Sequence, residues 1–237
     1  MGNFARWFSL YRTRRESLIG AATTALHDQT NLRVGWFRIN NRRNVTMYNM
    51  TNDDEKSTLL DDIMKDMRAS SSTPNRSAAD YLGQQFKRTD AKAPVLLSCQ
   101  KNAGMLFTDG YINETENRTL MKDLVAPYYE KSLVDTKETN SVPVPSECKG
   151  ANPDPALDCQ THLHMNFYGV TLGTLGKEFG VKYLPEPKRP WVLSPNPYVN
   201  KPNFPTSTQD LKPEAVDELW NAVYDTCLLY TSLSGLA

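Results

Sequence analysis

Hydrophobic side chains recur at three- and four-residue intervals in the first third of the chain, and this spacing predicts amphipathic helices. The pattern places one helix at residues 4–26, a second from residue 32 to about residue 39, and a third at residues 52–68. The third has the clearest start, because acidic residues fill its first turn after a capping side chain. Since three short amphipathic helices can bury their apolar faces only against one another, we expect an antiparallel three-helix bundle at residues 1–70.

Weaker helical patterns follow this segment. Helices are predicted at residues 77–88 and 115–133, the second bent or interrupted by Pro127, and a last helix begins near Pro213. Residues 163–184 interleave glycines with aromatic and apolar side chains. That pattern fits either a closely packed helix or a loop, and the low helix propensity of glycine favours the loop.

The segment from Pro185 to Pro213 contains eight prolines, with Trp191, Tyr198 and Phe204 between them. Such a segment favours an extended, polyproline-like chain that cannot build a core of its own. We therefore expect it to lie on the surface of a partner. The predicted fold is mainly α, in three regions: the bundle at residues 1–70, additional helices at 71–135, and an irregular proline-rich extension with a terminal helix at 136–237.

Charge is distributed unevenly along the chain. The 237 residues have a net charge of zero and a mean hydropathy of −0.55, yet residues 1–50 hold eight arginines, no lysine and only two acids, Glu16 and Asp28. An arginine-rich basic end suits a partner that carries carboxylates or phosphates, because the planar guanidinium makes paired hydrogen bonds to them. An arginine-rich, acid-poor N-terminus is also typical of a mitochondrial import signal.

A Leu10-Tyr11-Arg12 triplet at the start of the first predicted helix is followed by a Phe37-Arg38 pair on the second. Together with the three-helix layout, these residues resemble the LYR-motif family of small mitochondrial proteins. The resemblance covers residues 4–68. Two features depart from the family pattern. The Thr13-Arg14-Arg15 sequence stands where the family often has further apolar residues after its motif, and Gly35 lies within the second predicted helix.

The resemblance implies a docking site for a mitochondrial acyl carrier protein. Its acidic helix would meet the arginines, and its acyl-phosphopantetheine would enter a slot between the helices, where Ala21, Ala22, Ala25 and Gly35 leave room. No cofactor would be bound directly. By its motif, the resemblance implies that Leu10, Tyr11, Arg12, Phe37 and Arg38 bind the carrier. By position rather than by motif, it adds Arg15, Arg42 and Arg43.

Two of the four cysteines are close in sequence, and two histidines follow them. Cys148, Cys159, His162 and His164 could form a metal site, but the spacing is not a usual zinc pattern and we expect no metal. A disulfide between Cys148 and Cys159 is an alternative in an oxidising compartment. The default expectation is two free thiols in a loop.

The sequence offers little for catalysis, since it contains no phosphate-binding glycine loop, nucleophile elbow or His-Glu metal motif. We expect no enzyme activity, no catalytic residue, no nucleic-acid partner and only indirect membrane contact. The resemblance implies an accessory subunit of a mitochondrial respiratory complex, most simply NADH:ubiquinone oxidoreductase (complex I), with the bundle on the matrix side of the inner membrane and the extension stapling neighbouring subunits. Alternatives are an assembly factor for iron–sulfur or respiratory enzymes, a mitoribosome-associated protein, and a structural subunit without a carrier partner.

Overall fold

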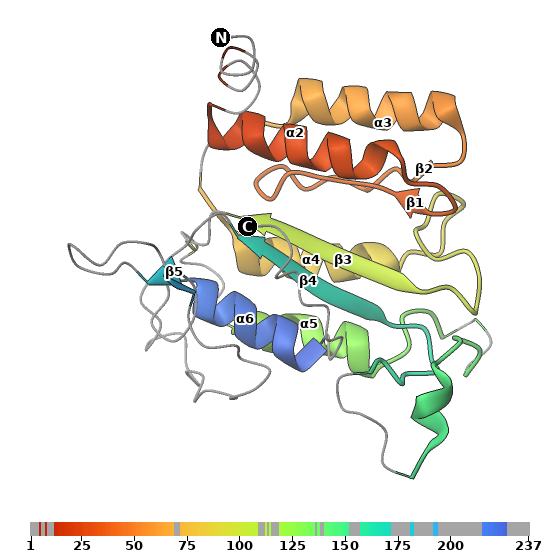
Figure 1. Cartoon of the computed structure of the whole chain (residues 1–237). Helices are drawn as coiled ribbons and strands as arrows, with labels where there is room; N and C mark the ends of the chain where they lie inside the picture. The colour runs from red at the N-terminus through yellow and green to blue at the C-terminus, as the bar shows by residue number, and fades with distance from the viewer. Residues whose placement is uncertain are drawn as a thin grey trace. The chain divides into compact units, whose positions relative to one another are not determined.

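The structure is a computed structural model of the 237-residue chain (Figure 1). It describes residues 5, 8, 12–68, 72–108, 112, 114, 119–135, 137, 140–151, 157–171, 181–182, 192–193 and 215–226. The chain divides into two compact units, each described here by itself. Unit 1 comprises residues 1–72 and 90–94, and unit 2 comprises residues 73–89 and 95–237.

Unit 1 contains two helices and a short antiparallel hairpin. Helix α2 (Arg14–His27) begins with a capping box formed by Thr13 and Glu16. Helix α3 (Asp53–Asp66) follows an Asn52 cap. Strand β1 (Arg33–Val34) pairs antiparallel with β2 (Tyr48–Asn49). The core that joins these elements is built on three buried side chains, with five partly buried ones packed around them: Met50, Leu59 and Ile63, then Leu26, Val34, Trp36, Tyr48 and Met67.

The expected mainly α fold with an N-terminal three-helix bundle is wrong. The segment that was expected to form the second helix is β1 followed by an irregular loop. Two local features oppose a helix there. A Cβ at position 35 would lie 2.2 Å from Cγ1 of Val45 and 2.7 Å from the carbonyl oxygen of Thr46, so the close packing of residues 45–46 leaves room only for glycine. Asn31, just before β1, has a positive φ of 59°.

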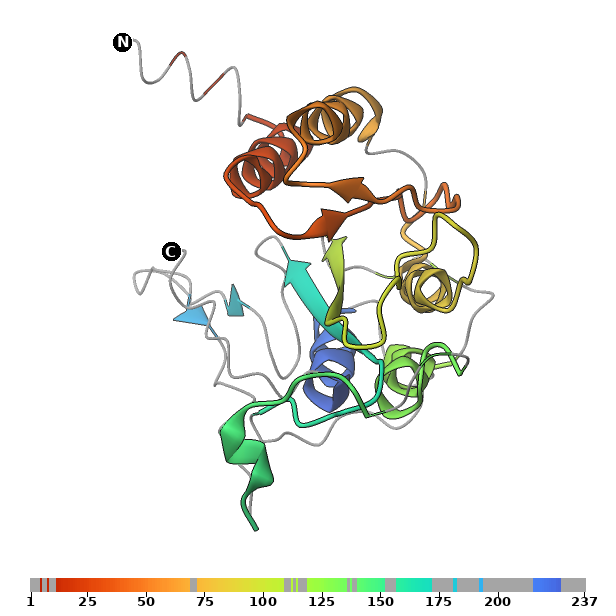
Figure 2. The same cartoon turned by 90° about the vertical axis from the view of Figure 1, so that its right-hand side faces the viewer.

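Unit 2 is built on a parallel strand pair. Strand β3 (Asn102–Thr108) and β4 (Met165–Thr171) pair in register over seven residues, from Asn102 opposite Met165 to Thr108 opposite Thr171. Helix α5 (Met121–Glu130) lies between them in sequence, which makes a β-α-β unit. Helix α4 (Asn75–Phe86) packs against β3, and α6 (Ala215–Thr226) packs against β4 and α5 (Figure 2).

Close packing and a buried ion pair hold the helices of unit 2 together. Gly83 on α4 faces the ring of Tyr128 on α5, where an added Cβ would lie 2.2 Å from a ring carbon. Arg76 on α4 makes two 2.8 Å hydrogen bonds to Glu218 on α6, and both residues are buried. Glu218 also accepts a hydrogen bond from the backbone N–H of Met121, so one carboxylate joins three helices.

The remaining described elements include strands in regions expected to be irregular. Residues 163–184, expected to be a loop or a closely packed helix, contain β4 and the two-residue strand β5 (Val181–Lys182). Strand β5 pairs with β6 (Val192–Leu193), and most of the proline-rich segment at 185–213 lies outside the described residues. A 3-10 turn, η1 (Ser146–Lys149), contains Cys148, which forms a disulfide with Cys159. Among the described helices, none is long and apolar enough to cross a membrane.

Candidate functional site

The arginines nearest the N-terminus lie at the start of α2. Leu10 and Tyr11, which precede Arg12, are outside the described residues. Arg12 lies 5.4 Å from the Phe8 ring centroid and 3.7 Å from the Glu16 carboxylate. Arg12 is exposed, so its charge faces solvent.

Arg15 has a structural role. Its guanidinium donates hydrogen bonds to the carbonyl oxygens of Met64, at 3.1 Å, in the last turn of α3, and of Met67, the residue that follows the helix. Those carbonyls have no partner within the helix, and they carry the negative end of its dipole. Arg15 therefore caps α3, and this bonding competes with the carrier-facing role that the resemblance implies.

Four of the other implied residues lie in the loop between β1 and β2. Arg38 and Arg43 each place a guanidinium nitrogen near Asp66, at 3.6 and 3.8 Å. Phe37 is half-buried and Arg42 is exposed in the same loop. The structure therefore brings Arg38 and Arg43 together at the end of α3.

Arginines and acids meet near this end of α3. Arg38 and Arg43 share the carboxylate of Asp66, and the Arg43 side chain is 53% exposed. Asp62, one turn earlier, lines the same cleft as Arg43. Ion pairs of this length and exposure contribute little to stability. Arg43 consequently keeps most of its capacity to bond another anion.

A polar cleft of about 140 Å³ opens beside Arg43, lined by Trp36, Arg43, Asn44, Thr46, Tyr48 and Asp62. The Arg43 guanidinium lies 5.7 Å from the Trp36 ring centroid. The Tyr48 hydroxyl donates a 2.7 Å hydrogen bond to Asp62. Burial, followed by this bond, raises the pKa of Tyr48, so the phenol stays protonated.

Trp36 contributes an unused donor to this cleft. Its indole N–H is buried and has no hydrogen-bond partner among the described residues. An unsatisfied buried donor costs about 1–3 kcal/mol. Because this nitrogen is buried, an acceptor in the cleft would reach it only if the indole turned toward the cleft.

The small residues that suggested an acyl slot in unit 1 do not line a space between helices in the described part of the chain. Ala21 and Ala25 are exposed on α2, and the side of Gly35 is filled by Val45, Thr46 and Met47. Ala22, the remaining small residue named for the slot, is half-buried on α2.

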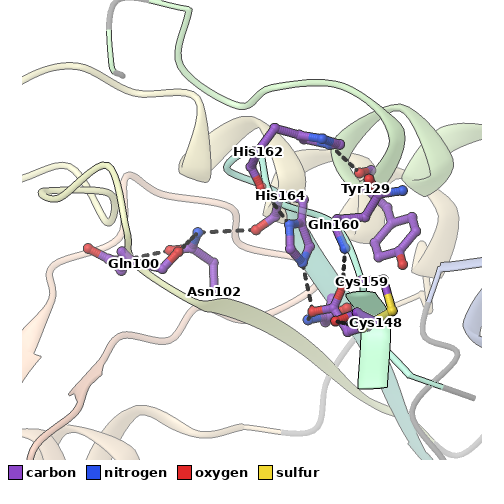
Figure 3. Close-up of polar contacts among 10 residues, drawn as sticks. Gln100, Asn102, Tyr129, Cys148, Cys159, Gln160, His162 and His164 are labelled. Carbon is purple, nitrogen blue, oxygen red and sulfur yellow. Dashed lines mark hydrogen bonds and ion pairs between the residues drawn. A yellow bond between two sulfur atoms is a disulfide. The ribbon is translucent and has the colours of Figure 1, made fainter. Parts of the chain in front are cut away.

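Unit 2 contains a buried polar network that the sequence did not reveal (Figure 3). Asp158 accepts hydrogen bonds from His164 Nε2 at 2.9 Å, Asn166 Nδ2 at 3.0 Å and the backbone N–H of Gln160 at 3.3 Å. The side chain of Asn102 donates to the carbonyl of His164 at 3.1 Å, which ties β3 to the residue before β4. The network therefore joins the disulfide loop to both strands.

Hydrogen-bond geometry fixes the charge of this network. Desolvation by burial raises the pKa of Asp158, but the hydrogen bonds from His164 and Asn166 and the charge of His164 outweigh it and lower that pKa to about 2. An ionised carboxylate only accepts, so His164 Nε2 must donate. His164 Nδ1 faces the carbonyl of His162 at 2.7 Å and must donate too. His164 is therefore an imidazolium paired with the Asp158 carboxylate.

The pairing of His164 with Asp158 has a structural role, and it does not leave His164 available as a general base. His164 is 1% exposed, and both ring nitrogens are engaged. His162 bonds the backbone carbonyl of Tyr129 at 2.9 Å. Cys148 and Cys159 are joined to each other, so the four residues weighed as a metal site are all otherwise occupied, and the described residues contain no group of three or more metal-ligating side chains.

Beside this network lies a second cleft of about 200 Å³, lined by Lys101, Asn102, Ala103, Pro145, Asp158, Asn166 and Tyr168. Asp158, Asn102 and Asn166, which form its buried polar part, were not predicted as site residues. A signal existed for Asn166, because polar and apolar residues alternate from His164 to Tyr168, as they do in a strand with two different faces.

Comparison with protein-family models, with curated proteins and with solved structures found no match for this chain.

Proposed function

We propose that the protein is a non-catalytic interaction module of an oxidising compartment, and that the cleft of unit 1 receives an anionic group of a partner protein. Two features of one cleft carry the proposal: the half-exposed guanidinium of Arg43, and the indole N–H of Trp36, for which the described residues supply no acceptor. Both residues line the cleft.

The donors favour a carboxylate or phosphate over a neutral ligand. Arg38 and Arg43 lie beside the Asp66 carboxylate, and the other acid of the cleft, Asp62, already accepts a hydrogen bond from Tyr48. An anion entering beside Arg43 would gain a charge-assisted hydrogen bond, and its second oxygen could accept from Trp36. Acidic side chains on a partner's surface supply such groups, which agrees with the basic character of residues 1–50.

The disulfide between Cys148 and Cys159 supports the oxidising compartment in this proposal. Disulfides persist in oxidising environments and are rare where glutathione and thioredoxin keep thiols reduced. The proposed compartment therefore differs from the mitochondrial matrix, which the family resemblance implied. An acyl carrier protein and the subunits of a respiratory complex stay predictions from the sequence.

The test is calorimetric titration of the full chain with an acidic probe, a peptide of consecutive glutamates with blocked ends. Holo-acyl carrier protein serves as a second probe for the partner that the resemblance implies. Arg43→Gln and Trp36→Phe should each weaken binding about tenfold, because each removes a hydrogen bond to a charged group. Arg68→Gln is the matched control, since Arg68 is exposed in the same unit but does not line the cleft.

A cleft-specific site requires that the control keep nearly full affinity. Equal losses for all three variants would show general charge attraction, and unchanged binding in Arg43→Gln and Trp36→Phe would place the interaction elsewhere. Either result refutes the proposal.

A further inference from the structure

The cleft of unit 2 has hydrogen-bonding capacity that the protein itself does not use. Asn166 is 6% exposed, and its Oδ1 has no partner among the described residues. Its Nδ2 donates one hydrogen bond, to Asp158, and keeps a second N–H. From the described residues, Asp158 Oδ1 accepts only the 3.3 Å bond from Gln160, whereas Oδ2 accepts two. The unused groups are therefore mainly acceptors, with one donor beside them.

The charges around the cleft favour a neutral ligand. The carboxylate of Asp158 is already paired with the His164 imidazolium, and Lys101 adds a positive charge at the rim. A cation would meet Lys101 and His164, and an anion would meet Asp158. A neutral molecule is repelled by none of these charges. Its hydroxyl groups can donate hydrogen bonds to Asn166 Oδ1 and Asp158 Oδ1.

The remaining walls are less polar. Tyr168 lies on the same face of β4 as Asn166, two residues further along, and Pro145 and Ala103 complete the rim. The volume of about 200 Å³ exceeds the roughly 150 Å³ cavity that holds a six-membered aromatic ring in a well-studied protein interior. A ring with an apolar face toward Tyr168 and hydroxyls toward Asn166 suits this combination.

We infer that the cleft beside β4 binds a monosaccharide or the terminal sugar of a glycan, with adjacent hydroxyls donating to Asn166 Oδ1 and Asp158 Oδ1. The second N–H of Asn166 donates to a sugar oxygen, and Tyr168 covers one face of the ring. Hydroxyl groups reproduce the hydrogen bonds of the water that they displace, so entry of the sugar leaves no buried polar atom unpaired. The inference concerns unit 2 alone and is independent of the anion site in unit 1.

Saturation-transfer NMR on the full chain tests this directly. The probes are glucose, galactose, mannose, N-acetylglucosamine, N-acetylgalactosamine and fucose, each at millimolar concentration. At least one sugar should receive saturation, and a titration should give its affinity. Asn166→Leu and Tyr168→Ala should each weaken that binding about tenfold. Phe107→Ala is the matched control, because Phe107 is a half-exposed aromatic on β3 that does not line the cleft.

Circular dichroism and an intact disulfide establish that each variant is folded. If Asn166→Leu does not fold, the sugar affinity of Tyr168→Ala, a change at the rim, tests whether the sugar binds in the cleft. Absence of transfer to every sugar overturns the inference, and so does transfer that survives the cleft variants. Calcium chloride is the competing probe: thermal stabilisation by calcium that Asn166→Leu abolishes, without any sugar binding, would make the cleft a cation site and overturn the inference as well.

Discussion

Replacing Asp158 by Asn tests the buried ion pair of unit 2. Asn has the same shape but no charge, so it leaves the His164 imidazolium without its counter-ion. Folding lowers the pKa of Asp158 from 3.8 to about 2, a difference equivalent to roughly 2.5 kcal/mol between the ionised and protonated carboxyl. The side chain of Asp158 is 9% exposed, so solvent screens little of this energy. We expect Asp158→Asn to lower the free energy of unfolding by about 2–3 kcal/mol at neutral pH.

The pH dependence gives the sharper result. Because the pKa of Asp158 is lower in the folded state, its contribution is fully present above pH 3.8 and is lost as the pH falls toward 2. Urea unfolding of both proteins between pH 7 and pH 2.5 should therefore show a difference that shrinks across the acidic end of this range. Asp135→Asn is the control, since Asp135 is exposed in the same unit. A difference below about 0.5 kcal/mol at neutral pH, or one that does not change with pH, would refute the charge assignment.

Two further perturbations address the framework around the clefts. Replacing Cys148 and Cys159 together by Ser opens a loop with a sequence separation of 11 and should cost about 3 kcal/mol in urea unfolding; no change in midpoint between the oxidised protein and the double variant would contradict a stabilising disulfide. Gly83→Ala forces a methyl group against the Tyr128 ring and should cost about 1–3 kcal/mol, measured by thermal unfolding. Gly150→Ala meets only Glu147 O at 3.5 Å and should be nearly neutral; equal effects of the two changes would show that α4 and α5 do not pack as described.

Local signals in the sequence located the helices that have clear ends. Asn52 and the acidic residues after it predict the start of α3, and the structure has that cap. The spacing of Leu32, Trp36 and Ile39 also looked helical, but this segment is β1 and a loop. Pairing with β2 and the close approach at Gly35 decide its conformation, and neither is visible in local periodicity.

The candidate sites were predictable to different degrees. Arginine composition pointed to Arg38 and Arg43, which the structure brings to one carboxylate. The loop bearing Asp158 lies outside any regular element, and its contact with His164 depends on the path of the disulfide loop. No spacing rule relates these residues. The alternation around Asn166 was available as a strand signal, but the glycines nearby favoured a loop in the prediction.

The ion pair between Arg76 and Glu218 spans 142 residues, and this sets an order of events during synthesis. Residues 1–72 and 90–94 emerge from the ribosome long before Glu218, so unit 1 can complete its own core early. Unit 2 must hold Arg76 without its counter-charge until α6 has been translated. In a nascent chain stalled before residue 215, unit 2 should therefore remain incompletely folded, with the faces of α5 and β4 that α6 covers exposed. This is the stage of synthesis at which we expect chaperones to bind the protein.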